Sequence, residues 1–174
     1  PQTRRIKIPG FYDRVRPLQD EERSLLARVP ITEEMARRLT GAPALAGEEG
    51  YTVLERASVR PTFDIHGIPG GFVGPGHKTV IPACAAAKLS MRLVPDQEPE
   101  EIAERFEAYL RTMAPPTVEL EVRRVGAARP AVVDYRAPAV QTMAQALARG
   151  FGAFPFYIRG GGSLPIVRSF QEVL

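Results

Sequence analysis

Two stretches of alternating polar and apolar residues constrain the fold of this chain most. Apolar side chains alternate with polar ones in residues 59–66 and again in residues 85–93. Period-two alternation predicts β-strands with one buried face and one polar face. Residues 67–82 between them are rich in Gly and Pro and too numerous for a tight hairpin, so we expect an exposed functional loop there.

The residues after the second predicted strand indicate a helix. Pro99 and an acidic first turn begin it, an apolar stripe continues to Met113, and Pro115 ends it. Alternation in residues 118–123 then predicts a third strand. Strand, loop, strand, helix and strand together predict an α+β fold, with an antiparallel sheet covered on one face by helices.

Helices are also expected on both sides of this unit. An acidic first turn indicates a helix in residues 20–29, and Thr32 and Gly41 delimit a second one in residues 32–39. Past Gly126, residues 138–151 form a further helical pattern, and residues 154–158 resemble a short buried strand.

Composition excludes several classes of protein. With 174 residues, of which 44% are hydrophobic, the chain can bury a core, and no apolar run is long enough to span a membrane. Its arginines are scattered beside Asp and Glu, so the net charge of +3 predicts neither a nucleic-acid nor a membrane partner. A single cysteine, Cys84, excludes an internal disulfide and agrees with a cytoplasmic location.

No self-contained active site is predicted. Residues 71–79 come close to a phosphate-binding loop, but His77 intrudes before Lys78, and Pro82 lies where the loop's helix would begin. Two His and one Cys offer no zinc-ligand spacing, and neither Cys84 nor Ser163 has an evident His and carboxylate beside it.

The sequence does contain residues that could hold a ligand. Arg92, on the polar face of its strand, could clamp a carboxylate, or it could be a solvated residue paired with an acid. The turn at residues 160–163 could present backbone N–H groups and the Ser163 hydroxyl to an anion, although Ser163 could equally be a plain helix N-cap.

Three ordered motifs, in residues 60–68, 70–83 and 91–95, carry a family resemblance. They read RPTFDIHGI, GGFVGPGHKTVIPA and MRLVP. The chain resembles the lid of the two-zinc metallopeptidase family that includes carnosine dipeptidase, aminoacylase, carboxypeptidase G and succinyl-diaminopimelate desuccinylase, and the dipeptidase branch most. Matches near both ends extend the resemblance over nearly the whole chain.

The resemblance implies a ferredoxin-like two-layer sandwich, incomplete at its N-terminal side, with three parts. Residues 1–50 would be a helical insertion and linker within the lid, residues 51–126 the lid or dimerisation core, and residues 127–174 the start of the return into a catalytic domain. The chain begins at Pro1, and residues 170–174 look like the first turns of a helix, so we expect a piece of a longer protein.

The resemblance also implies a function and a set of site residues. The parent would be a homodimeric hydrolase of small peptides or N-acyl amino acids, using two zinc ions that this chain does not bind. Thr79 would reach into the partner's site, Arg92 would bind the substrate carboxylate, and Gly162 and Ser163 would hold the substrate; this chain would contribute no catalytic residue. Gly160 stands where the family usually has Glu. The alternative is a non-catalytic dimerisation or ligand-binding module.

Overall fold

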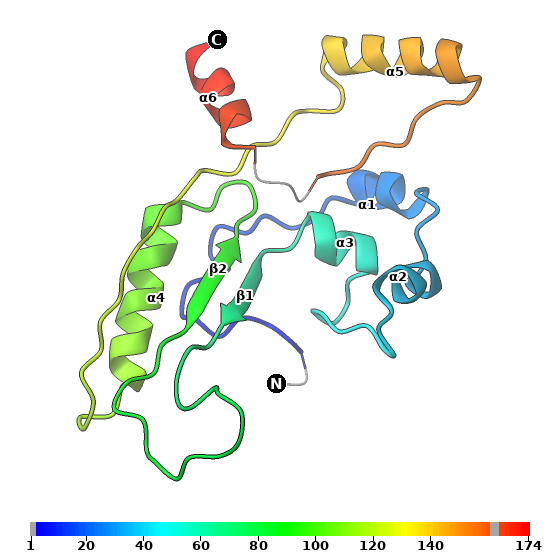
Figure 1. Cartoon of the computed structure of the whole chain (residues 1–174). Helices are drawn as coiled ribbons and strands as arrows, with labels where there is room; N and C mark the ends of the chain where they lie inside the picture. The colour runs from blue at the N-terminus through cyan, green and yellow to red at the C-terminus, as the bar shows by residue number, and fades with distance from the viewer. Residues whose placement is uncertain (1–2, 161–163) are drawn as a thin grey trace.

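The computed structural model describes residues 3–160 and 164–174 and has a mixed α+β fold (Figure 1). Over these ranges it contains one two-stranded antiparallel sheet and six helices. In chain order the elements are α1 (Asp20–Ala27), α2 (Glu33–Thr40), α3 (Val53–Ser58), β1 (Thr62–Gly67), β2 (Lys88–Arg92), α4 (Pro99–Met113), α5 (Pro138–Phe151) and α6 (Pro165–Val173). The predicted α+β class is confirmed.

The sheet separates a polar face from an apolar one. Thr62 lies opposite Arg92, and Phe63 lies opposite Met91 in the neighbouring pair. Because successive strand residues point to opposite faces, Phe63 and Met91 share the face that packs on the core. The ring centroids of Phe63 and Phe106 are 5.6 Å apart, so α4 covers this apolar face.

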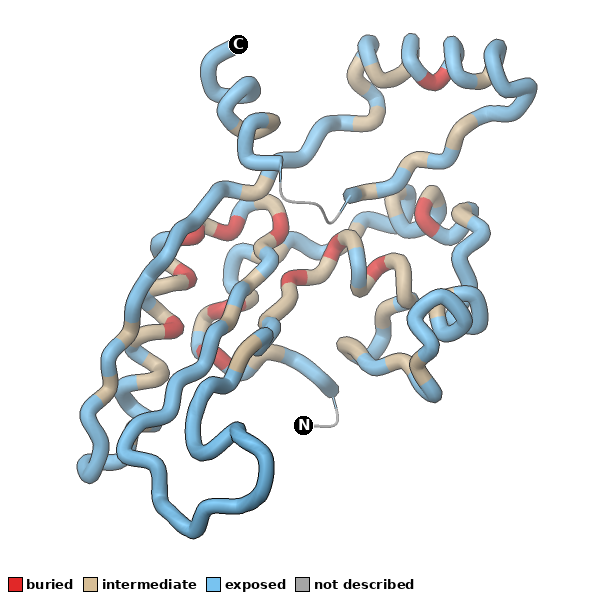
Figure 2. The backbone as a smooth tube through the Cα atoms, viewed as in Figure 1, coloured by how far each residue is buried: buried red, intermediate tan, exposed pale blue. Residues whose placement is uncertain are grey.

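The core lies between α4, the sheet and the N-terminal segment. Ile8, Phe11, Ile102 and Phe106 form one buried cluster, and Figure 2 shows the buried positions concentrated here while the loop after β1 is exposed throughout. Gln97 is buried as well, and both ends of its side-chain amide are satisfied. It accepts a hydrogen bond from the Val94 N–H and donates one to the Phe11 carbonyl, at 3.0 and 2.8 Å.

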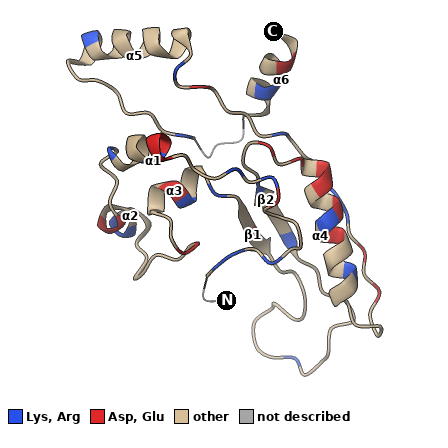
Figure 3. Cartoon of the chain, turned by 180° about the vertical axis from the view of Figure 1, so that it is seen from behind, with Lys and Arg blue, Asp and Glu red and all other residues tan. Residues whose placement is uncertain are grey.

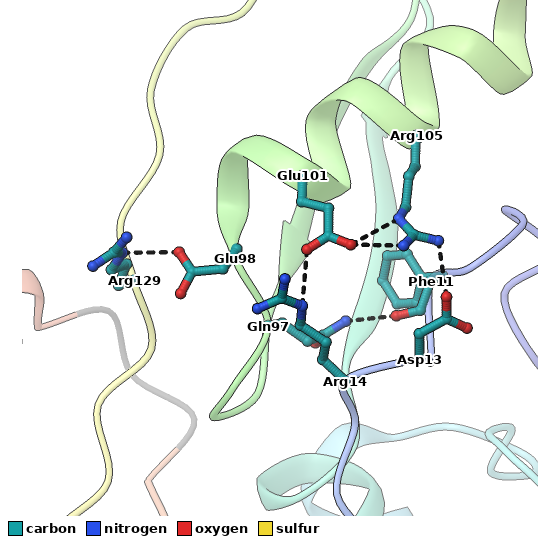
Figure 4. A network of polar contacts seen from close by, with 8 residues as sticks. All are labelled: Phe11, Asp13, Arg14, Gln97, Glu98, Glu101, Arg105 and Arg129. Atoms are coloured by element: carbon teal, nitrogen blue, oxygen red, sulfur yellow. Dashed lines mark hydrogen bonds and ion pairs between the residues drawn. The ribbon is translucent and has the colours of Figure 1, made fainter.

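Ion pairs fasten the first turns of α4 to the N-terminal segment (Figure 4). Glu101 accepts hydrogen bonds from Arg105 one helical turn later and pairs with Arg14 at 2.9 Å. Arg105 also reaches Asp13 at 3.0 Å. The segment before α1 is therefore held on α4 by charged contacts at the surface as well as by Phe11 in the core.

Local capping chemistry sets the short helices. The Thr32 hydroxyl accepts from the Met35 N–H at 3.1 Å, and Gly41 ends α2 in the left-handed conformation, as the sequence predicts. Helix α3 was not predicted, although Thr52 and Glu55 form a reciprocal capping box at its start. The signal was a Thr followed three residues later by Glu.

Two predicted strands are wrong. Residues 118–123 are extended but pair with no strand in the described part of the chain; they belong to a segment that runs along α4 (Figure 1). Ion pairs of Arg124 with Glu107 at 3.0 Å and of Arg129 with Glu98 at 2.9 Å hold that segment. Residues 154–158 are neither a strand nor buried, since Phe154 is 56% and Ile158 60% exposed. Alternation or apolarity alone does not supply the neighbouring strand that a ladder requires.

Candidate functional site

Arg92 ends β2 on the polar face of the sheet. The pairing register puts it opposite Thr62, while Asp64 and Ser90 form the next pair but one on the same face. Arg92 is exposed, and Met91 on the other face of the strand packs against the core. This arrangement presents a planar guanidinium from a fixed backbone, which suits bidentate recognition of a carboxylate.

Thr79 lies in the long loop between the strands. An isolated bridge between Gly70 and Ala85 and a 2.8 Å hydrogen bond from the Ala86 N–H to the Pro69 carbonyl close the base of this loop. Beyond that base every residue is exposed, and the loop extends away from the sheet (Figure 1). Val73 and Ile81 are 90% and 96% exposed, so the loop presents apolar side chains around Thr79 to its surroundings.

The structure does not bring Thr79 and Arg92 together. The loop that carries Thr79 joins β2 at Lys88, whereas Arg92 is at the other end of the strand. Five residues of extended chain span roughly 13 Å from the first Cα to the last. The two predicted substrate contacts therefore lie at opposite ends of one hairpin.

Gly162 and Ser163 lie outside the described residues. The chain that leads to them is described up to Gly160, and Arg159 is half-buried. Arg159 pairs with Glu22 and shares a small pocket with Val94 and Pro95, which follow directly after the end of β2. Residues 159–160 thus approach the end of the sheet at which Arg92 lies.

A buried ion pair was missed by sequence reasoning. Arg60, just before β1, donates to both carboxylate oxygens of Glu48 at 2.8 and 2.9 Å, and the two side chains are only 9% and 10% exposed. Burial is the largest single influence and would lower the pKa of Arg60, but the hydrogen bonds to Glu48 together with the charge attraction of Glu48, Tyr51 and Tyr12 raise the pKa above its usual value. Tyr12 and Tyr51 flank the guanidinium at 5.1 and 4.5 Å, on one side of an open cleft of about 530 Å³. No signal local in sequence connects Arg60 with Glu48, twelve residues earlier.

Charges of both signs are mixed over the molecule, most clearly on α2 and α4 (Figure 3). In residues 3–160 and 164–174, no group of three or more His, Cys, Asp or Glu side chains is placed to hold a metal ion. These described residues therefore do not fit a zinc site. None of the described helices has the length and apolar character that crossing a bilayer requires.

Comparison with known families decides the relationship. The model of the peptidase dimerisation domain matches residues 27–118, more than half of the chain. The chain belongs to this peptidase dimerisation domain family. The metallopeptidase relationship inferred from the motifs is confirmed, because the most similar proteins include metallodipeptidases.

Relatives of this dimerisation domain are considerably longer. The Cys-Gly metallodipeptidase DUG1 of Candida albicans is 29% identical over 174 residues, which cover 98% of this chain and 36% of that protein. The structure of the metallo-carboxypeptidase Sso-CP2 from Sulfolobus solfataricus superposes with a TM-score of 0.82 at 31% identity, over 93% of this chain and 37% of the other. The structure of human carnosine dipeptidase 1 superposes with a TM-score of 0.82 at 27% identity, over 99% of this chain and 37% of the other. The chain thus spans little more than a third of the proteins that it matches.

Proposed function

We propose that this dimerisation domain is the lid of a metal-dependent, dipeptidase-like hydrolase, which pairs two subunits and positions a small peptide or N-acyl amino acid. The observation that carries the proposal is the likeness in fold to human carnosine dipeptidase 1 over 99% of the chain. Arg92 and Thr79 lie at opposite ends of one hairpin, so in this proposal the lid would have two separate points of contact with substrate.

Arg92 is the proposed anchor for the substrate's carboxylate. Its guanidinium offers paired N–H donors in one plane. The described chain before Gly162 and Ser163 reaches the same end of the sheet through Arg159.

Thr79 is proposed to act in the partner's site. Because it lies at the far end of the hairpin from Arg92, one substrate would touch both residues only if they came from different subunits, as the short reach of a Thr side chain requires. We propose that two copies pair along β1, whose outer edge has no partner strand in the described chain.

The three-part organisation is also a proposal. Residues 1–50 supply the helical insertion, residues 51–126 the lid core, and residues 127–174 the return into a catalytic domain. Residues 118–123 alternate in sequence but pair with no strand in the described part of the chain, and a ferredoxin-like sandwich that lacks a strand at its N-terminal side would account for this. In α5 only Ala144 is buried, while Met143 and Phe151 are 61% and 82% exposed, which fits a helix that packs against a larger body.

The zinc ions belong to the part of the longer protein outside this chain. Bound there, they would supply Lewis-acid chemistry for amide hydrolysis. The lid contributes binding and orientation instead: it fixes the carboxylate end of the substrate and closes a neighbouring site against water. Cleavage chemistry is therefore not expected from residues 1–174 alone.

The direct test is hydrolysis of dipeptides and N-acyl amino acids by the full-length protein, with and without added zinc, beside this chain. We expect zinc-dependent cleavage by the full-length protein and none by the chain, with both sedimenting as dimers. A full-length protein that is inactive on the whole panel would contradict the hydrolase proposal and leave a non-catalytic dimerisation or ligand-binding module. A monomeric chain would contradict pairing through β1.

A further inference from the structure

Helix α1 meets the chain on both sides of α5. Glu21 forms an ion pair with Arg136, two residues before α5 begins, and Glu22 forms one with Arg159, eight residues after it ends. Hydrogen bonds from Tyr135 and from Arg136 lower the pKa of the Glu21 carboxyl, so it stays charged at neutral pH. Two adjacent acids of one helical turn thus contact the departing and the returning segment together.

The two segments beside α5 are also tied to each other. The rings of Tyr135 and Tyr157 lie 5.6 Å apart. The side-chain amide of Gln141, in the first turn of α5, donates to the Tyr135 carbonyl at 2.6 Å and to the Tyr157 hydroxyl at 3.0 Å. We therefore treat α5 and these flanking residues as one unit, the α5 body, defined as residues 135–159.

Helix α1 is anchored to the lid core on its other side. Arg23 pairs with the buried Glu55 at 3.2 Å and lies over the Tyr51 ring at 5.9 Å. Leu26 is buried beneath the helix. Three consecutive charged residues therefore face two ways: Glu21 and Glu22 hold the α5 body, and Arg23 holds the core.

The two ion pairs differ in how far they are shielded from water. Arg136 and Glu21 are 57% and 59% exposed, so that pair is screened and contributes little. Arg159 and Glu22 are only 19% and 22% exposed, so removing one partner leaves a poorly hydrated charge. The Glu22–Arg159 pair is consequently the dominant contact between α1 and the α5 body.

We propose that Glu21 and Glu22 form an ionic clasp, the two ion pairs that hold the α5 body at one angle to the lid core. Breaking these ion pairs would let the lid core rotate relative to the α5 body. The proposal deepens the proposed function, because it rests on the lid and the α5 body belonging to different domains. Helix α1 (residues 20–27), within the helical insertion, would then restrain the α5 body relative to the lid core.

The test measures the distance between the two bodies without using activity. Spin labels are placed at exposed positions of α4 and α5 through Glu104→Cys and Gln145→Cys in a Cys84→Ser background, and the distance distribution is recorded by pulsed electron resonance. Glu22→Gln is expected to widen the distribution by roughly twofold or more, since a local restraint is lost. The matched control is Asp20→Asn, which removes one negative charge from an exposed residue of the same turn.

A charge swap separates the ion pair from a simple effect of substitution. Glu22→Arg combined with Arg159→Glu is expected to restore the narrow distribution. An unchanged width of the distance distribution in Glu22→Gln would contradict the ionic clasp. A distribution that stays wide in the charge-swapped variant would also contradict it, because the substitution itself and not the loss of the ion pair would then cause the widening. The result is independent of hydrolysis, so an inactive full-length protein would contradict the proposed function without touching this measurement.

Discussion

Replacing Arg92 by alanine in the full-length protein is expected to lower kcat/KM for dipeptides with a free C-terminal carboxylate by about 100-fold, or about 3 kcal/mol, since charged hydrogen bonds are lost. The effect should appear mainly in KM if the carboxylate is held equally in the bound and transition states. Arg92→Lys should recover only part of the loss, because an ammonium cannot make the two parallel hydrogen bonds of a guanidinium.

The matched substrate for this prediction is the same dipeptide with a C-terminal amide. Without a carboxylate it cannot use the clamp, so wild type and Arg92→Ala should cleave it with similar kcat/KM. Equal losses on the acid and the amide would contradict the clamp and indicate a structural role for Arg92. Unchanged kcat/KM on both substrates would mean that Arg92 does not contact the substrate.

The second large effect is on folding. Phe11 is 1% exposed, packs with Ile8, Ile102 and Phe106, and its carbonyl accepts the hydrogen bond from buried Gln97. Phe11→Ala should lower the free energy of unfolding by about 3–5 kcal/mol, because a large buried ring is replaced by a cavity. A loss of that size is a substantial share of the stability of a single domain, so urea unfolding should shift to a much lower midpoint.

Phe72 provides the control for this substitution. It lies in the long loop and is 49% exposed, so Phe72→Ala removes the same ring without leaving an enclosed cavity. The expected change is within about 0.5 kcal/mol. Equal destabilisation by the two substitutions would mean that the N-terminal segment does not belong to the core described above.

Elements with local signals could be predicted from the sequence. Helix α5 occupies its predicted residues 138–151, with Pro138 at its start and a left-handed Gly152 at its end. Helix α2 follows equally from Thr32 and Gly41. The strands came from period-two alternation, but the same pattern in residues 118–123 gave a wrong prediction, because pairing depends on a neighbour that no local pattern encodes.

The candidate site could be predicted only in its parts. Motifs pointed to Thr79 and Arg92, but their separation to opposite ends of the hairpin depends on how the 68–87 loop leaves the sheet. The buried Arg60–Glu48 pair and the contact of Glu22 with Arg159 join residues that only tertiary packing brings together. Long-range ion pairs of this kind leave no period or spacing in the sequence.

The measurement that tests the central claim most directly is the activity of a purified heterodimer of the full-length protein, with Thr79→Ala in one subunit and Arg92→Ala in the other. If Thr79 serves the partner's site and Arg92 its own, one of the two sites is intact, and activity should be about half that of wild type by the symmetry of a two-fold dimer. Both homodimeric variants should be strongly impaired. A heterodimer no more active than these homodimers would contradict a lid that completes its neighbour's site.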